Sequence, residues 1–301
     1  PSYVLGILLL VATLAVGTGA GTAAGVKSFI SIGGFRFQPA EVAKIATILA
    51  VARLLSGRRE EVQNLRELLA PVALVGLPLA LVVLQPDLGT SLAFIGILFA
   101  MLYWGGTPVP LLILLASPGL GLILSYDLVV WSAYIIVLTL SLYFYRYRLY
   151  LVESVTVVLA NLAAGTIALP LWQSLADYQK NRLLVFLDPN VDPRGAGWQI
   201  IQSKVAIGSG GLTGQGFKMG SQKRLDFLPE QHTDFIFSVV GEELGFIGTL
   251  LVILAFFFVF YRLILLASRA ADPFAGLVIF GIFGAWITHV FVNIGMTVGL
   301  V

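Results

Sequence analysis

The sequence predicts an all-α membrane protein, a polytopic bundle of transmembrane helices with one large, partly helical extracytoplasmic loop. Hydrophobic residues make up 58% of the 301 residues and charged residues only 11%, whereas a soluble domain carries about 25% charged residues. The net charge of +2 provides no basic field for nucleic acid. There is no cysteine and there are only two histidines, so no pattern indicates a metal site. We expect residues 1–301 to form a single multi-pass domain with lipid as its main solvent.

Nine apolar runs make up the predicted bundle, and each is expected to be a helix because lipid offers no hydrogen-bond partners to open backbone groups. A crossing needs roughly 20 residues, or about 17–25 when the helix is tilted. We identify no pattern typical of a strand. The last run has no polar tail after it, so we expect the given chain to be incomplete at its ends. The nine runs are residues 2–17, 42–55, 68–84, 88–104, 109–124, 128–145, 149–172, 235–261 and 274–300.

Arginine residues predict the orientation, because short cytoplasmic links carry an excess of Lys and Arg. Counting nine crossings places all three arginine-bearing links on one side, which is therefore the cytoplasm. The extracytoplasmic side receives the link 18–41 and the long segment 173–234. The arginines in or beside the three links are Arg53, Arg58, Arg59 and Arg66, then Arg146 and Arg148, then Arg262 and Arg269.

The large extracytoplasmic loop, residues 173–234, is predicted to be partly ordered. Its segment 198–207 has apolar residues at helical spacing, which indicates an amphipathic helix on the outer membrane surface. The glycine-rich run 208–220 matches neither the dinucleotide fingerprint nor the P-loop. We expect it to act as a hinge or to allow close backbone approach.

A first cluster of charges lies at the outer end of a predicted helix, in the segment FRFQPAEVAK. Pro39 suits the first turn of a helix, and Glu41 and Lys44 share a face because they are three residues apart. Arg36 precedes them, and cations at a membrane surface suit a phosphate or pyrophosphate group. The alternative is that Glu41 and Lys44 only neutralise each other at the helix start.

A second polar motif, QPDLGTS, places Asp87 after a proline and before an apolar run. This arrangement is typical of a helix N-cap. We favour a cap without a catalytic role, and a catalytic carboxylate is the alternative.

A third cluster lies at the mouth of the run 235–261. Asp234 is the last charge before this run, where it could serve as a general base, a role that typically contributes about 10²–10⁴-fold to a rate. The alternative is that Asp234 caps the helix with Thr233 beside it, and that Glu242 and Glu243 form buried pairs. The polar residues that crowd before the run include Lys223, Arg224, Glu230, His232, Thr233 and Asp234.

Five motifs in this order resemble the SEDS family (shape, elongation, division, sporulation), and in particular its RodA-type branch. They are FRFQPAEVAK, QPDLGTS, GAGWQIIQSKVAIGSGGLTGQG, FLPEQHTDFIFSVVGEELG and FVNIGM. The FLPEQHTDFIF block is the most specific of them. Members of the family commonly have one crossing between the QPDLGT helix and the large loop, where this sequence predicts three, within residues 109–172.

The resemblance implies a peptidoglycan glycosyltransferase of the bacterial cytoplasmic (inner) membrane that polymerises lipid II on the extracytoplasmic side for cell-wall elongation and cell shape. It implies a class B penicillin-binding protein, a transpeptidase, as partner, besides lipid II and membrane lipids. The family's essential acidic residue falls on Asp234, and its important cations fall on Arg36 and Lys44. No cofactor is implied, and assistance by a divalent cation is left open. The expected substrate-binding residues are Arg36, Glu41, Lys44, Lys223, Arg224, Glu230, His232 and Thr233.

The product of such an enzyme is a β-1,4 glycan made from an α-linked donor, so the reaction inverts the anomeric centre. Asp234 is then expected to act as general base on the acceptor hydroxyl. Two other functions are considered: a flippase or transporter of the lipid-linked precursor, and a non-catalytic scaffold that activates a penicillin-binding protein. A flippase needs a polar path through the midplane, whereas the clusters above lie at the outer ends of the runs, which favours the enzyme.

Overall fold

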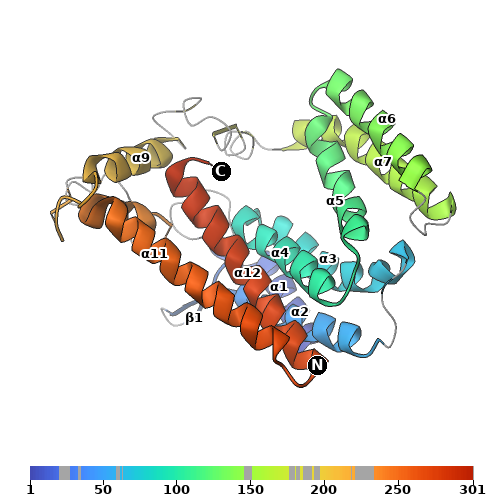
Figure 1. Ribbon diagram of the computed structural model, residues 1–301, viewed down its shortest axis with the longest axis horizontal. Coiled ribbons are helices and arrows are strands. Elements are labelled where there is room, and N and C mark those ends of the chain that lie inside the picture. The colour runs from blue at the N-terminus through green and yellow to red at the C-terminus, as the bar shows by residue number, and fades with distance from the viewer. Residues whose placement is uncertain are drawn as a thin grey trace. The chain divides into compact units, whose positions relative to one another are not determined.

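The computed structural model describes residues 1–19, 28–32, 35–58, 62, 64–145, 151–175, 180, 184–185, 192, 197–217, 219–220 and 234–300. Within these residues the predicted all-α class is confirmed, and each of the nine apolar runs is a helix (Figure 1). The segment 198–207 is also helical, as predicted. The helices are α1 (Ser2–Val16), α2 (Pro39–Ser56), the 3₁₀ helix η1 (Leu65–Leu68), α3 (Leu69–Val83), α4 (Leu88–Trp104), α5 (Val109–Leu124), α6 (Leu128–Tyr145), α7 (Leu151–Ser174), α9 (Trp198–Gly210), α11 (Ile236–Ser268) and α12 (Pro273–Val298).

A short antiparallel strand pair, β1 (Ile30–Ile32) and β2 (Phe35–Phe37), corrects the expectation that no strands form. Each strand has three residues, too few to show an alternating pattern in sequence. The signal that could have revealed them is the Gly-Gly dipeptide between the two runs, which favours a two-residue hairpin connection. Their register pairs Ser31 with Arg36, immediately before α2.

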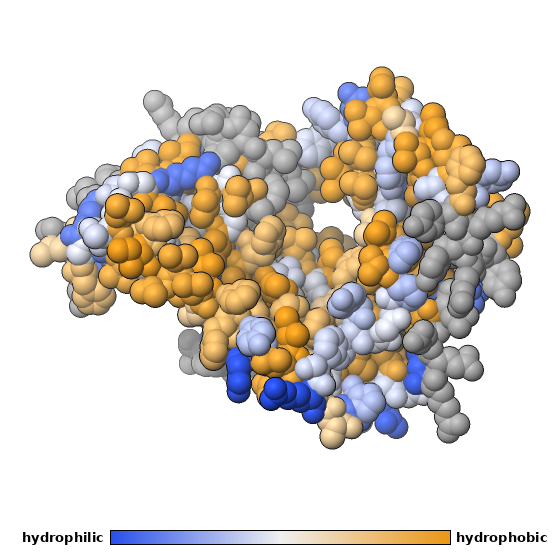
Figure 2. All heavy atoms as spheres, viewed as in Figure 1, coloured by the Kyte–Doolittle hydropathy of each residue, from blue (hydrophilic) through white to orange (hydrophobic). Residues whose placement is uncertain are grey.

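Membrane crossing by all nine helices stays a prediction, because only some of them are long enough when judged by length and composition. Four described helices qualify: Leu65–Val83, Leu151–Gln173, Ile236–Ser268 and Pro273–Val298. The shorter apolar helices are Ser2–Val16, Leu88–Trp104, Val109–Leu124 and Leu128–Phe144. Apolar side chains of α11, such as Phe257 and Leu251, are exposed, as expected for contact with lipid. Hydrophobic residues cover much of the face of the molecule seen in Figure 2.

The chain divides into two compact units. The first comprises Pro1–Leu175 with Ala270–Gly284, and the second comprises Ala176–Arg269 with Ala285–Val301. In the first unit, helix α1 packs on α2, and α3 packs on α4, around fully buried side chains that include Leu10, Val51, Val75, Phe94 and Met101. In the second unit, α9 packs on α11.

Helices α5, α6 and α7 pack together around a buried polar network in the first unit. The hydroxyl oxygen of Tyr134 lies 2.9 Å from the Ser117 carbonyl oxygen and 2.9 Å from Asn161 Oδ1. Asn161 Nδ2 donates to Ser117 Oγ at 2.8 Å and to the Val157 carbonyl at 2.9 Å. Polar groups surrounded by apolar helices must find partners inside the protein, and this network provides them.

Candidate functional site

The amino-terminal end of α2 carries the first predicted cluster. Gln38 occupies the cap position and Pro39 the first turn, which accommodates proline because its missing N–H has no helical partner there. Lys44 Nζ lies 2.9 Å from Glu41 Oε1, and the two side chains are 7% and 55% exposed. The predicted shared face is therefore confirmed, with the ammonium group nearly buried and the carboxylate at the surface.

Arg36 lies three residues before the first residue of this helix, on β2, and is exposed. The strand pair fixes its backbone by pairing it with Ser31. Arg36 is therefore exposed shortly before the start of α2, and the backbone amides at the start of a helix attract anions.

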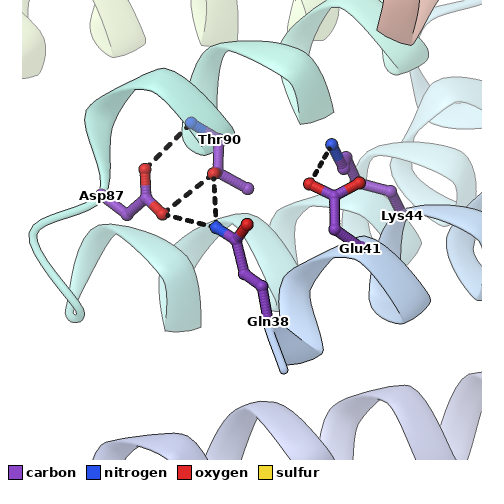
Figure 3. Close-up of polar contacts among 5 residues, drawn as sticks. All are labelled: Gln38, Glu41, Lys44, Asp87 and Thr90. Atoms are coloured by element: carbon purple, nitrogen blue, oxygen red, sulfur yellow. Dashed lines mark hydrogen bonds and ion pairs between the residues drawn. The ribbon is translucent and has the colours of Figure 1, made fainter. Parts of the chain in front are cut away.

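Asp87 is the N-cap of α4, as the sequence predicts. Its Oδ1 accepts a hydrogen bond from the Thr90 backbone N–H at 3.1 Å, and its Oδ2 accepts one from the Thr90 hydroxyl at 2.9 Å. Gln38 Nε2 also donates to Asp87 Oδ2 at 3.1 Å, with Thr90 Oγ1 at 3.3 Å (Figure 3). The amide of Gln38 thus joins the start of α2 to the start of α4, the helix that Asp87 caps.

Gln38 is a residue of this site that the sequence did not single out. Both glutamine–proline motifs, FQPAE and QPDLGT, precede a helix, but only the structure shows that the first glutamine reaches the aspartate of the second motif. The remaining glutamine, Gln85, is buried and donates to the Leu10 carbonyl of α1 at 3.1 Å. Neither contact can be inferred from local sequence, because the partners are about 50 and 75 residues away.

Asp234 lies in the second unit, exposed, in the turn that leads into α11. The cap position of α11 is Phe235, one residue after Asp234. Phe235 is buried and packs with Ala206 of α9 and with Met296 of α12. The buried Phe235 side chain thus fixes the backbone next to Asp234, which is itself exposed.

A buried hydroxyl pair ties together the elements behind Asp234. Ser203 Oγ of α9 lies 2.6 Å from Ser238 Oγ of α11 and also donates to the Thr297 carbonyl of α12 at 2.6 Å. Both serines are completely buried. Ser238 is four residues after Asp234, so this pair holds the first turn of α11 against two other helices.

The predicted site residues therefore fall in both units. Arg36, Glu41 and Lys44 belong to the first unit, and Asp234 belongs to the second. Glu242 and Glu243 of α11 are buried, which is the burial that the alternative interpretation of this cluster supposed. The remaining predicted substrate-binding residues lie outside the described part of the chain: Lys223, Arg224, Glu230, His232 and Thr233.

Comparison with known proteins places this arrangement in a family. The family model described as cell cycle protein (FtsW/RodA/SpoVE) matches residues 1–149 and 127–301. These two matches overlap at residues 127–149, in the region where the sequence predicts crossings beyond the family pattern. The peptidoglycan glycosyltransferase MrdB of Escherichia coli K12 is 38% identical, over 99% of this chain and 68% of its own length. The peptidoglycan glycosyltransferase RodA of Treponema pallidum is 35% identical, over 92% of this chain and 70% of its own length.

Solved structures agree with this placement. A chain from a peptidoglycan synthase complex that coordinates polymerization and crosslinking has a TM-score of 0.68 and 26% identity, covering 99% of this chain and 70% of that one. The rod shape determining protein RodA of Thermus thermophilus, at 23% identity and a TM-score of 0.54, shares the fold, over 98% of this chain and 64% of that one.

Apolar helices long enough to span a bilayer, with charged and polar side chains gathered at their ends, define an integral membrane protein. The chain belongs to the FtsW/RodA/SpoVE family of cell cycle proteins, which is the SEDS family that its motifs resemble.

Proposed function

We propose that the chain is a peptidoglycan glycosyltransferase that polymerises lipid II into β-1,4 glycan strands, for cell-wall elongation and cell shape. Relatives named for this activity match nearly the whole chain at 35–38% identity and support the proposal. The observation that carries the mechanism is the exposed carboxylate of Asp234, held at the start of a long apolar helix by the buried Phe235.

In this mechanism Asp234 acts as general base. Its carboxylate takes the proton from the 4-hydroxyl group of the acceptor sugar, and that oxygen attacks C1 of the donor sugar from the face opposite the leaving group. The new C1–O4 bond forms as the bond between C1 and the pyrophosphate oxygen breaks, so the configuration at C1 inverts. No acid is required, because the polyprenyl pyrophosphate leaves as a stable anion.

The cations of the first cluster are proposed to bind the pyrophosphate. Arg36 is exposed beside the start of α2, and its planar guanidinium group suits phosphate oxygens. Lys44 contributes a second positive charge, which Glu41 orients through the 2.9 Å ion pair. Fixed positive charge stabilises the negative charge that develops on the departing group. Lys223, Arg224, Glu230, His232 and Thr233 are proposed to complete the substrate site.

We propose that the protein lies in the cytoplasmic (inner) membrane with its active site on the extracytoplasmic side. The proposed partner is a class B penicillin-binding protein that crosslinks the product strands. The similarity to a chain from a peptidoglycan synthase complex supports this pairing.

The test compares two identical substitutions in purified protein supplied with lipid II. Asp234→Asn should lower glycan polymer formation by at least about 10²-fold, the loss expected for a general base, with lipid II binding unchanged. Asp127→Asn is the matched control. Asp127 accepts hydrogen bonds from the Val129 and Val130 amides at the start of α6, a role that asparagine also fills. Full activity is expected of this control.

Three results would contradict the proposal, and two of them identify an alternative function. Parental polymer yield from Asp234→Asn would remove this carboxylate from the mechanism. Polymer that forms only with the transpeptidase present, and regardless of residue 234, would indicate a scaffold. Movement of lipid II across vesicle membranes without any polymer would indicate a flippase.

A further inference from the structure

Helix α11 is broken at Gly245, whose backbone has φ 66° and ψ −161°. In an unbroken helix the amides of Phe246 and Ile247 would donate to the carbonyls of Glu242 and Glu243, four residues earlier. Here the Phe246 N–H donates to the Gly211 carbonyl at 2.9 Å, and the Ile247 N–H donates to the Leu212 carbonyl at 3.2 Å. Both acceptors belong to the glycine-rich segment that follows α9.

The carbonyl groups released by the break are also satisfied by this segment. The Gln215 N–H donates to the Glu242 carbonyl at 2.9 Å, and the Gly216 N–H donates to the Glu243 carbonyl at 3.1 Å. Two helical hydrogen bonds are therefore replaced by four hydrogen bonds to residues 210–216, which we name the glycine clasp. Such replacement is what burial requires, because the residues at the break are buried and an unpaired buried backbone group costs free energy.

The clasp requires glycine where the two backbones meet. Gly214 has φ +81°, and a Cβ atom there would overlap the carbonyl group of Glu243. A Cβ atom on Gly210 would overlap the carbonyl oxygen of Gly241. By contrast, Gly208 lies within α9 with nothing within 4 Å of a Cβ atom. The close backbone approach expected for the glycine run is confirmed, and its partner is the break in α11.

We infer that the glycine clasp is a positioning element for Asp234, an inference that rests on the proposed function. The break separates the short first part of α11, residues 236–244, from the rest of the helix, and Asp234 stands at the far end of this short part. At 1.5 Å per residue this part is about 13 Å long, so a swing of about 10° around Gly245 moves its end by roughly 2 Å. A misplacement of about 1 Å can lower a catalytic rate about 10²-fold.

The Ser203–Ser238 contact acts together with the clasp. It joins α9 to the first turn of α11 at 2.6 Å, while the clasp joins the carboxyl end of α9 to both sides of the break. The short part is therefore fixed at both of its ends by one neighbouring element. Discontinuous membrane helices of this kind are found where a protein holds groups for a substrate.

The experiment uses three alanine substitutions in the full chain, assayed for glycan polymer. Gly214→Ala should lower kcat at least tenfold with a smaller change in KM for lipid II, because the base moves while the proposed pyrophosphate-binding residues Arg36 and Lys44 belong to the other unit. Gly216→Ala, strained at φ +103° but with only the Met219 side chain nearby, should have the same effect to a smaller extent. Gly216→Ala replaces Gly214→Ala in the test if Gly214→Ala does not fold. Gly208→Ala is the control and should match the parent.

A second readout measures the bend of α11 directly. The chain has no cysteine, so cysteines introduced at the exposed positions Ile236 and Phe257 give a unique pair of spin labels on either side of Gly245. The distance distribution should be narrow in the parent and in Gly208→Ala, and broadened or shifted by 2 Å or more in Gly214→Ala. Activities are measured in the unlabelled chains.

The outcomes separate this inference from the proposed function. Parental activity of Gly214→Ala, or lost activity with an unchanged distance distribution, overturns the positioning role and leaves the proposed function standing. A parent that makes no polymer overturns both. Reduced kcat together with a disturbed distance distribution, absent from Gly208→Ala, supports the inference.

Discussion

The hydrogen bond between Gln38 and Asp87 links two polar motifs about 50 residues apart and makes a quantitative prediction. Asp87→Ala removes the α4 cap, worth about 1 kcal/mol, and the carboxylate that accepts from Gln38 at 3.1 Å. A hydrogen bond to a charged group contributes about 1.5–3 kcal/mol, and partial exposure favours the lower end. We therefore expect a loss of about 2–3 kcal/mol in the free energy of unfolding from Asp87→Ala and about 1.5 kcal/mol from Gln38→Ala.

A double-mutant cycle tests the link itself, with unfolding in detergent micelles titrated by a denaturing detergent and followed by circular dichroism. The double variant should be more stable than additivity predicts by about 1.5 kcal/mol, because the shared bond is lost only once. The matched cycle pairs Gln38→Ala with Asp127→Ala, another helix-capping aspartate that shares no described partner with Gln38. The coupling energy between Gln38 and Asp127 in this cycle should be zero. A Gln38–Asp87 coupling below about 0.3 kcal/mol, the usual limit of additivity, would refute the link.

Two further predictions concern helices α5 to α7. Asn161→Ala removes the centre of the buried network and should lower the free energy of unfolding by about 1 kcal/mol. The same detergent titration measures this change. An unchanged free energy of unfolding would show that the network does not stabilise the bundle. Gly165→Ala places a Cβ atom against the indole ring of Trp131 and should lower the free energy of unfolding by about 1–3 kcal/mol. Gly119→Ala, which has open space around its Cβ atom, should leave the free energy of unfolding unchanged or raise it. Equal effects of the two substitutions would contradict this packing.

The helices were predictable because lipid leaves the backbone few choices. Residues 88–104 and 109–124 are predicted as apolar runs and form helices with these same bounds. Boundaries set by a charge alone were less accurate. The run 235–261 stops before Arg262, whereas α11 continues to Ser268, because a long basic side chain can reach polar surroundings from within a helix.

The elements of the site that sequence reasoning missed depend on pairs of distant segments. The strand pair needs two three-residue stretches that have no meaning separately. The role of Gln38 depends on its hydrogen bond to Asp87, which local sequence does not reveal. Gly245 is one of several glycines within apolar runs, and its conformation follows only from the clasp that begins 35 residues earlier. Local pattern specifies an element, but it does not specify which other element supplies the missing hydrogen bonds.

The break in α11 also separates two parts of the helix that have different roles. Residues 246–268 alone are about 35 Å long at 1.5 Å per residue, which exceeds the roughly 30 Å hydrocarbon core of a bilayer. The part after Gly245 is therefore sufficient to span the membrane, and the nine residues before it are not needed for crossing. Buried backbone groups would keep them in one straight helix unless other protein groups compensated the break, and the glycine clasp provides that compensation. The position of Asp234 is thus set by the contact of the short part with α9, and is not imposed by a continuous helix.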